Sequence, residues 1–366
     1  MKKKVFHFIH GLTFGGAETL VKEFAIGLDK SKFDVTILCS IKYGTAYEKL
    51  LEDAGIRIIY IHDYTVCFPK NVFEKIFFYL QRFLRVKSII RKEKPDIIHI
   101  HLCLNSYIKF ARPKKPVKLF YHVHAEPSFV WRSNERDKKA AKWLVKNYGM
   151  RFITLHNRMK NEINSMFDVD NSVVLNNGID FKRFENLKPK NVKRTELKIP
   201  EDAFVIGNIG RFAPEKNHHF LVQIFNSISK KSEKAFLLLV GDGSLKAEIS
   251  SELERLCLGG KYLILSNRSD IPDLLHCMDM LVLPSLSEGL GIVLIEAQKA
   301  GTCCLASDVV PKETAVSNLI TYKSLSEYAN VWADEILKFS VPEVKYINIE
   351  DWDMKNVIKK LEEIYL

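Results

Sequence analysis

The sequence predicts an α/β protein of two doubly wound, Rossmann-like domains, each a mostly parallel sheet covered by helices. Three observations support this prediction. The chain has 366 residues, too many for one such sheet and suitable for two domains of roughly 150–180 residues each. Short β-rich runs alternate with amphipathic helical segments in both halves. Residues 177–200 are rich in Lys, Asn and Pro and lack apolar periodicity, which is typical of a hinge.

The predicted strands can be assigned in order along the chain. Six are expected in the first half, at residues 5–9, 34–38, 57–61, 96–100, 118–123 and 151–155. Five are expected in the second half, at residues 204–209, 235–240, 262–265, 280–283 and 302–306. The last segment is helical in pattern, with one apolar face made of Val357, Leu361, Ile364 and Tyr365. We therefore predict a first domain over 1–180, a linker over 181–200, a second domain over 201–348, and a helix over 349–366 that crosses back to the first domain.

The composition is that of a packed globular protein. With 47% hydrophobic and 27% charged residues, it excludes disorder, collagen-like repeats and a coiled coil. No apolar run approaches the roughly 18–20 residues that span a bilayer. The basic start is followed by a segment that two His and two Gly interrupt, which favours a strand and a glycine turn over a signal peptide. Seven Cys without a CxxC spacing indicate a reduced, cytoplasmic protein.

The charge is divided unequally between the two halves. Residues 1–190 contain 35 Lys and Arg against 19 Asp and Glu, whereas residues 191–366 contain 20 against 25. A basic half attracts nucleic acid, anionic lipid or phosphorylated substrates. No zinc finger, RNA-recognition motif or basic zipper is present in the sequence, so we expect no nucleic-acid partner.

Two loops combine glycine or basic residues with the end of a predicted strand. Gly15 and Gly16 stand where the first strand leads into a helix, and there they suit either an anion at the helix start or a plain tight turn. Arg211 and Lys216 follow the strand at 204–209 beside the hinge. Two cations there suit a diphosphate, and the alternative is a solvated surface pair.

A third loop follows the strand at 235–240 and contains Gly241 and Gly243. Such a glycine turn lets a ligand approach the backbone closely. Ligands of doubly wound sheets bind outside the carboxyl ends of the strands, so two such domains joined by a hinge are expected to bind a ligand in the cleft between them.

The strongest indication of a functional site in the sequence is a segment that begins and ends with a glutamate. Glu288 precedes a predicted helix, Glu296 lies eight residues further along it, and Gly289, Leu290 and Gly291 stand between them. Eight helical residues span roughly 12 Å, which suits hydroxyl groups at both ends of a sugar nucleotide. The free amides at the helix start would then face its diphosphate. The alternative is a loop Glu and a salt-bridged helix Glu, but a carboxylate among Val, Leu, Ile and Ala favours a functional site.

These motifs resemble retaining glycosyltransferases of family 4 (glycosyltransferase group 1), which have the two-domain GT-B fold. The resemblance runs the length of the chain and includes the E-x7-E spacing from Glu288 to Glu296. The other matching segments are GGAE, HVH with His124, NNGID, GRFAPEKN, VGDG, RSDIPDLL, LPSLSEGLGIVLIEAQKAG and SDVVPKE. The last three segments resemble most closely the EpsF-like branch, which builds exopolysaccharide or capsule.

The resemblance implies a role for each matching position. Glu288 would contact donor-sugar hydroxyls and Glu296 the ribose hydroxyls, while Arg211 and Lys216 would bind the diphosphate. His124 would lie near the sugar; without the resemblance, a strand-end histidine of structural role is the simpler interpretation. The glycine loops and helix start would complete the donor site: Gly15, Gly16, Gly241, Gly243, Gly289, Leu290 and Gly291. Members of this fold usually work without a metal, so we expect no metal and no cofactor, with a UDP-linked sugar as substrate.

Two positions depart from the family pattern. Asn267 stands where Gly is common, and His156 stands where a small residue is usual.

The predicted helix over 72–94 indicates the kind of acceptor. One stripe mixes basic and apolar residues: Lys75, Phe78, Arg82, Arg85, Ile89 and Lys92. A separate apolar arc is expected to face the core: Val72, Ile76, Tyr79, Leu80, Phe83, Leu84, Val86 and Ile90. The stripe suits docking on an anionic membrane, and a solvated helix face is the alternative. We therefore expect a lipid-linked oligosaccharide acceptor and peripheral attachment at the inner face of the cell membrane.

Three alternatives stay open. The acceptor of the glycosyltransferase could be soluble, with the basic face serving solubility. The chain could be a GT-B sugar-nucleotide 2-epimerase, which needs no acceptor. It could also be a non-catalytic sensor of nucleotide sugars, although every charged position of the donor motif is filled.

Overall fold

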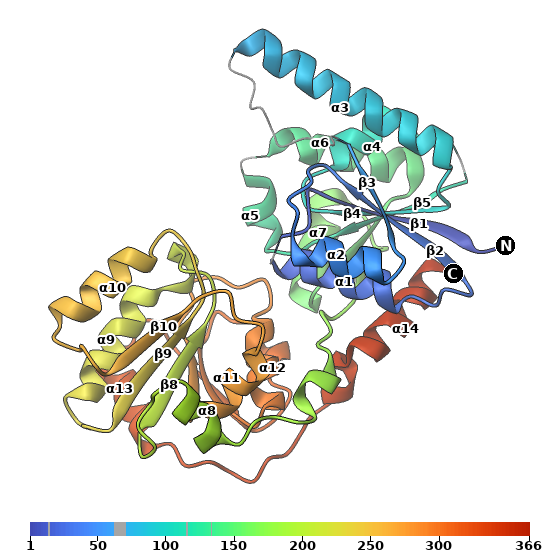
Figure 1. Ribbon diagram of the computed structural model, residues 1–366. Helices are drawn as coiled ribbons and strands as arrows, with labels where there is room; N and C mark the ends of the chain where they lie inside the picture. Colours follow the sequence, from blue (N-terminus) through green and yellow to red (C-terminus); the bar gives the residue numbers. More distant parts are fainter. Residues whose placement is uncertain (14, 62–70, 115, 133) are drawn as a thin grey trace. The chain divides into compact units, whose positions relative to one another are not determined.

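The chain forms two compact α/β units. The computed structural model describes residues 1–13, 15–61, 71–114, 116–132 and 134–366, with only the backbone of residues 72, 73 and 75. The first unit comprises residues 1–178 and 354–366, and the second residues 179–353 (Figure 1). Each unit is a parallel sheet with helices on both faces, which confirms the predicted fold class.

The first sheet has seven parallel strands in the order β3-β2-β1-β4-β5-β6-β7. The strand order reverses at β1, which pairs with β2 on one side and with β4 on the other. Ligands of doubly wound sheets bind at the point where the strand order reverses. The six predicted strands are confirmed, and a two-residue β7 is added. The bounds are β1 Lys3–Ile9, β2 Phe33–Cys39, β3 Arg57–Tyr60, β4 Ile97–His101, β5 Lys118–His122, β6 Arg151–Thr154 and β7 Val173–Val174.

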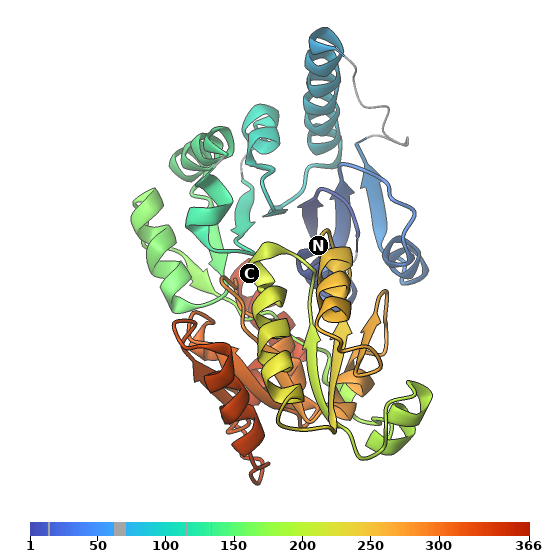
Figure 2. The same ribbon diagram turned by 90° about the vertical axis from the view of Figure 1, so that its left-hand side faces the viewer.

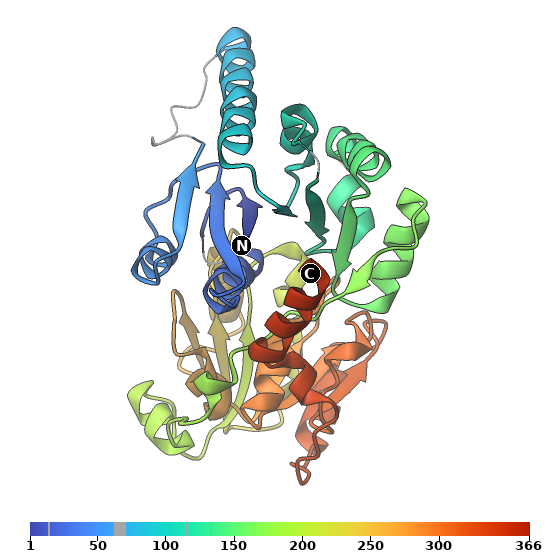
Figure 3. The same ribbon diagram turned by 90° about the vertical axis from the view of Figure 1, so that its right-hand side faces the viewer.

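The last helix, α14 (Met354–Tyr365), packs in the first unit beside α1 (Gly16–Gly27) (Figure 3). Val357 and Leu361 on its predicted apolar face are fully buried. Gly27 of α1 permits a close approach, because a Cβ there would lie 2.1 Å from Ile358 Cδ1. The remaining helices of this unit are α2 Ala46–Asp53, α3 Val72–Glu93, α4 Asn105–Ala111, α5 Pro127–Arg132, α6 Glu135–Tyr148 and α7 Asn157–Phe167.

The second sheet has six parallel strands in the order β10-β9-β8-β11-β12-β13. The five predicted strands are confirmed, and β13 is an additional edge strand. Their bounds are β8 Phe204–Ile209, β9 Ala235–Val240, β10 Tyr262–Leu265, β11 Met280–Leu283, β12 Cys303–Ser307 and β13 Ile320–Lys323. The helices are α8 Lys190–Glu196, α9 His218–Ser229, α10 Lys246–Arg255, α11 Ile271–Cys277, α12 Ile292–Lys299 and α13 Ala329–Lys338, with short turns η1 Phe181–Phe184, η2 Pro214–Lys216, η3 Lys312–Thr314 and η4 Ile349–Trp352.

The segment 181–200, which we expected to be a linker, is folded into the second unit. It carries η1 and α8, and Arg194 of α8 is buried with its Nη2 2.7 Å from Asp279 Oδ2. A buried guanidinium needs such a carboxylate, so this ion pair ties the segment to the sheet. The chain leaves the first unit after Gly178 and returns to it at Met354.

Helix α3 is oriented differently from our prediction. Its amino-terminal half projects beyond α4 and α6 (Figures 1 and 2). Four residues of the expected core arc are therefore exposed: Ile76, Tyr79, Leu80 and Leu84. The periodicity identified a continuous apolar arc, but no described element of the first unit covers that arc along the projecting turns.

The opposite side of α3 faces the unit. Phe83, Val86 and Ile90 are buried as predicted, but so are Arg82 and Ile89, which we had placed on the basic surface stripe. The side chain of Lys75 lies outside the described residues. Among the described helices, none combines the length and the apolar character that a membrane span requires.

Candidate active site

Two loops of the second unit meet at the carboxyl end of its sheet. Lys216 ends η2 after β8, and Glu288 follows β11, the neighbour of β8 in the sheet. The Leu286 amide donates to the Glu215 carbonyl over 2.8 Å, which joins the two loops. Their side chains meet as well, with Lys216 Nζ 2.6 Å from Glu288 Oε1. The structure thus brings together two predicted residues that lie far apart in sequence.

Only one of the two oxygens of the Glu288 carboxylate accepts hydrogen bonds from described residues. Ser285 Oγ donates to the same Oε1 over 2.7 Å, and the Glu288 side chain is only 8% exposed. Within the described part of the chain, no group donates to Oε2. A carboxylate fixed in this way presents its second oxygen to the hydroxyl groups of a ligand without having to reorient.

The start of α12 lies directly after this carboxylate. Gly291 caps the helix in the left-handed conformation (φ 84°, ψ 48°), which favours glycine at this position. Leu290 is buried, and α12 begins at Ile292. The first amides of a helix have no partner within it and carry partial positive charge, so this turn is suited to an anion.

Glu296 lies in the second turn of α12 and is half-buried. Burial raises its pKa to about 7, and the positive charge of Arg183 opposes that rise. A carboxyl group held near its neutral form, without a fully compensating cation, suits hydrogen bonding to hydroxyl groups.

Arg211 is not part of the Lys216–Glu288 pair. Its side chain is 71% exposed, and its Nη2 lies 2.7 Å from Glu215 Oε1. The glycine turn after β9 packs on the loop that contains Arg211: a Cβ at Gly241 would lie 1.9 Å from the Gly210 carbonyl oxygen. At Gly243 it would lie 2.4 Å from a neighbouring carbonyl. These glycines therefore allow two loops to touch, a packing role that we had not predicted.

The remaining predicted residues belong to the first unit. Gly15 caps α1 and Gly16 begins it, as expected from the glycine pair. The carboxylate of Glu18 already folds over this helix start: Thr13 Oγ1 donates to its Oε1 over 3.2 Å. A Cβ at Gly15 would lie 2.2 Å from its Oε2. A negative charge in the first turn opposes the positive end of the helix dipole, so Glu18 partly offsets the attraction of this helix start for an anion.

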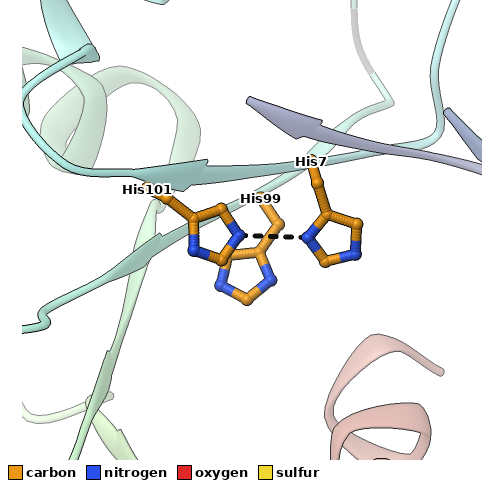
Figure 4. Close-up of side chains that lie close together, drawn as sticks. All are labelled: His7, His99 and His101. Carbon is orange, nitrogen blue, oxygen red and sulfur yellow. Dashed lines mark hydrogen bonds between the residues drawn. The ribbon is translucent and has the colours of Figure 1, made fainter. Parts of the chain in front are cut away.

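His124 follows β5 and ends a chain of three hydrogen-bonded imidazoles. Its Nε2 lies 3.0 Å from His101 Nδ1, and His101 Nε2 lies 3.0 Å from His7 Nδ1 (Figure 4). Each neutral ring has one donor and one acceptor nitrogen, so the three tautomers are coupled. The His101 and His7 rings therefore decide which nitrogen of His124 carries its proton.

Two further histidines extend this cluster. The cluster was not predicted from the sequence. His99 and His122 are fully buried on the same side of the sheet, because the alternation H-x-H ends β4 (His99, His101) and recurs across the end of β5 (His122, His124). That repeated alternation was the signal that could have revealed the cluster. Two groups of three have ring nitrogens within 4.8 Å of one another, a spacing that could hold a metal ion: His7, His99 and His101, and His101, His122 and His124.

The cluster predicts acid sensitivity of the first unit. Burial lowers the pKa of His7 and of His124 to about 3, and burial together with neighbouring imidazoles lowers the pKa of His99, His101 and His122. The unfolded chain takes up these protons near pH 6.5 and the folded chain does not. The contribution of these neutral histidines to the free energy of unfolding is therefore fully present above pH 6.5 and is lost as the pH falls towards 3.

Each such histidine is expected to lower the free energy of unfolding by about 2 kcal/mol at pH 5. Urea titrations at pH 7.5 and 5.0 measure the loss, and His122→Phe should diminish it by the share of one histidine. A free energy of unfolding that stays constant between these two values would contradict the prediction.

Both departures from the family pattern have a structural explanation. His156 caps α7, and its Nδ1 accepts a hydrogen bond from the Met159 amide over 3.2 Å. Asn267 adopts the left-handed conformation (φ 55°), which Asn tolerates better than other residues with a side chain. Neither residue disturbs the backbone that its position requires.

Two sequence families match the chain, one in each unit. The model described as Glycosyltransferase Family 4 matches residues 14–183. The model described as Glycosyl transferases group 1 matches residues 189–324. Together they cover most of the chain.

Two relatives match almost the full length. EpsF of Bacillus subtilis (strain 168), whose name assigns it to the glycosyltransferases, is 28% identical over 355 residues, covering 92% of this chain and 88% of EpsF. The UDP-Gal:alpha-D-GlcNAc-diphosphoundecaprenol alpha-1,3-galactosyltransferase of Escherichia coli is 25% identical over 376 residues, covering 97% and 94%.

Solved structures share the fold. Anabaena HepE, crystallised with UDP and glucose, superposes with a TM-score of 0.78 at 17% identity and 99% coverage of both chains. WaaG, a glycosyltransferase of lipopolysaccharide biosynthesis, superposes with a TM-score of 0.74 at 16% identity and 99% coverage of both chains.

Proposed function

The chain belongs to glycosyltransferase family 4 and has the GT-B fold, and from this we propose that it transfers a sugar from a UDP-linked donor to a lipid-linked saccharide, with retention of anomeric configuration. The product would be a repeat unit of exopolysaccharide or capsule. The observation that carries the donor part of the proposal is the Lys216–Glu288 pair beside the start of α12. The names of the two full-length relatives support the acceptor part.

The geometry of the second unit is suited to stabilising a leaving diphosphate. When the sugar–phosphate bond breaks, negative charge develops on the diphosphate and positive charge at the anomeric carbon. Lys216 and the α12 amides are fixed before the reaction, so no reorganisation is needed to oppose the negative charge. We assign Arg211 to the same diphosphate, for which it would exchange its exposed partner Glu215.

The two carboxylates would hold the ends of the donor. Glu288 Oε2 is available to hydroxyl groups of the sugar, and Glu296 to those of the ribose, on opposite sides of the diphosphate. In the first unit, His124 is assigned to a hydroxyl group of the transferred sugar. Its proton position would be set by His101 and His7.

Retention would follow from attack on one face of the sugar. The acceptor oxygen forms a bond to the anomeric carbon on the side that the diphosphate leaves, and the acceptor proton passes to the departing phosphate oxygen. Glu288 has its Oε1 engaged by Lys216 and Ser285, which favours a binding role over that of a covalent nucleophile. We propose that no metal or cofactor takes part, and that EDTA leaves turnover unchanged.

Product analysis tests the proposal and separates its alternatives. The protein is incubated with radiolabelled UDP-glucose or UDP-galactose and a polyprenyl-diphosphate-linked GlcNAc, and the products are separated and their anomeric configuration determined. An α-linked lipid product is expected. Transfer only to soluble saccharides would point to a soluble acceptor, a C2-inverted sugar nucleotide without acceptor to an epimerase, and binding without turnover to a sensor.

The projecting part of α3 is the surface that we propose to contact the membrane. Ile76, Leu80 and Leu84 recur every four residues on one face and are 61%, 47% and 50% exposed; Phe77 beside them is 63% exposed. Exposed basic residues follow on the next turns of the same helix: Arg85, Arg91 and Lys92. An exposed apolar stripe with adjacent cations is typical of helices that lie in the surface of an anionic bilayer.

Sedimentation with vesicles tests this surface. At low salt, the protein is expected to sediment with phosphatidylglycerol vesicles and much less with phosphatidylcholine vesicles. Leu80→Asp should reduce the bound fraction several-fold, because it places a charge in the apolar stripe. Val341→Asp, a control at an exposed apolar residue of the second unit, should not change it. Equal sedimentation with both lipids would contradict the proposal.

A further inference from the structure

Arg82 is a buried guanidinium that has no counterion among the described residues. It lies on the inward side of α3, is 8% exposed, and forms no salt bridge with any described residue. Within the described ranges, its Nε has no hydrogen-bond acceptor. The other two buried basic residues of the described chain, Lys193 and Arg194, are each paired with a carboxylate. Arg82 is the exception.

Aromatic rings flank this guanidinium. The Arg82 Cζ lies 5.4 Å from the centroid of the Phe78 ring and 5.5 Å from that of the Tyr107 ring. Such contacts contribute much less free energy than it costs to desolvate an ion. The rings therefore orient the guanidinium without replacing the anion that a buried arginine ordinarily has.

A second arginine approaches the same aromatic group from another helix. The rings of Tyr107 and Phe83 are stacked with centroids 4.5 Å apart, and the Cζ of Arg136 on α6 lies 5.4 Å from the Phe83 centroid. Burial raises the pKa of Tyr107, and the positive charges of Arg82 and Arg136 oppose this rise. Arg136 forms no salt bridge with a described residue either.

The position of this cluster is informative. Tyr107 lies in the first turn of α4, directly after the carboxyl end of β4, and β4 adjoins β1 at the point where the strand order reverses. This is the edge at which doubly wound sheets bind ligands. Two guanidinium groups lie at that edge, and neither is paired with a described carboxylate. Such groups suit phosphate oxygens, which arginine binds in a bidentate manner.

We propose that Arg82, with Arg136 and Tyr107, binds a phosphate group of the acceptor's diphosphate. This rests on the proposed lipid-linked acceptor and extends it by naming the residues that recognise the head group. The apolar stripe of the same helix would contact the lipid while the inward face holds the diphosphate. A soluble diphosphate and an anionic phospholipid share the same chemistry, so the experiment must separate these sources.

The experiment uses the full chain in excess UDP, so that the donor loops of the second unit are occupied. Inorganic diphosphate, farnesyl diphosphate and phosphatidylglycerol vesicles are titrated in separate arms, and the heat of binding is measured in each. The variants are Arg82→Met, which keeps the apolar stem, Arg82→Lys, which keeps the charge, and Lys49→Met as a control at an exposed residue on α2 of the same unit. Melting temperature and UDP affinity of each variant report whether both units remain folded.

The wild-type protein is expected to bind farnesyl diphosphate more tightly than inorganic diphosphate. Arg82→Met should weaken binding at least 10-fold, Arg82→Lys less, and Lys49→Met less than two-fold. Absence of binding to the wild type, or equal affinity in Arg82→Met, would overturn the proposal. A loss seen only with phosphatidylglycerol vesicles would also overturn it, in favour of a general phospholipid site. Failure of the glycosyltransfer proposal is recognised separately, because it would appear as absent transfer from UDP-sugars irrespective of Arg82.

Discussion

Lys216→Ala is expected to lower the turnover of sugar transfer by about 10²- to 10³-fold, the cost of removing one preorganised group that stabilises developing charge. Lys216 is only 19% exposed, and its ammonium is held by Glu288 at the carboxyl end of the sheet. Solvent cannot replace it easily there. The Michaelis constant for the donor should change less than turnover, since the diphosphate is more negative in the transition state than in the bound substrate.

Lys234→Ala is the matched control, because Lys234 is an exposed residue of the same unit whose partner is Asp202. It should transfer sugar at the wild-type rate. Steady-state kinetics with saturating acceptor measure both variants, and melting temperatures show that both are folded. Wild-type turnover in Lys216→Ala would remove this lysine from the mechanism.

Glu288→Gln is expected to lower turnover by about 10- to 100-fold, because hydrogen bonds to a charged group contribute about 1.5–3 kcal/mol. The amide keeps the shape of the side chain but not its charge. It would leave Lys216 without its anion and would replace one acceptor oxygen by a donor. The effect should appear in transfer and in the hydrolysis of the donor alike, since both reactions use the same sugar contacts.

Glu254→Gln is a suitable control, because this carboxylate accepts a hydrogen bond at the edge of the same sheet from Tyr262, away from the loops after β8 and β11. Should Glu288→Gln retain full activity with each UDP-sugar tested, the carboxylate would have no part in binding the sugar.

The strands were predictable because buried parallel strands are short, continuous and apolar. The strand at Ala235–Val240 is buried at every position, and its bounds agree with the prediction. The strand at Ile320–Lys323 was missed because it is a short edge strand with polar residues, which has the composition of a loop. A strand of two residues, Val173–Val174, has no detectable periodicity.

Pairing between distant residues was less accessible than the residues themselves. The sequence identified Lys216 and Glu288 by their surroundings, but their contact depends on β8 and β11 being neighbours, which the order of strands along the chain does not reveal. The orientation of α3 could not be predicted for the same reason. Its period separates two faces, yet only the neighbouring elements decide which face is covered.

The most direct test of the account is a crystal structure of the full chain with a UDP-sugar. The diphosphate should lie within hydrogen-bond distance of Lys216 Nζ and the first amides of α12, with Glu288 on the sugar and Glu296 on the ribose. A diphosphate bound at any other place, or carboxylates at 288 and 296 that contact neither sugar nor ribose, would contradict it.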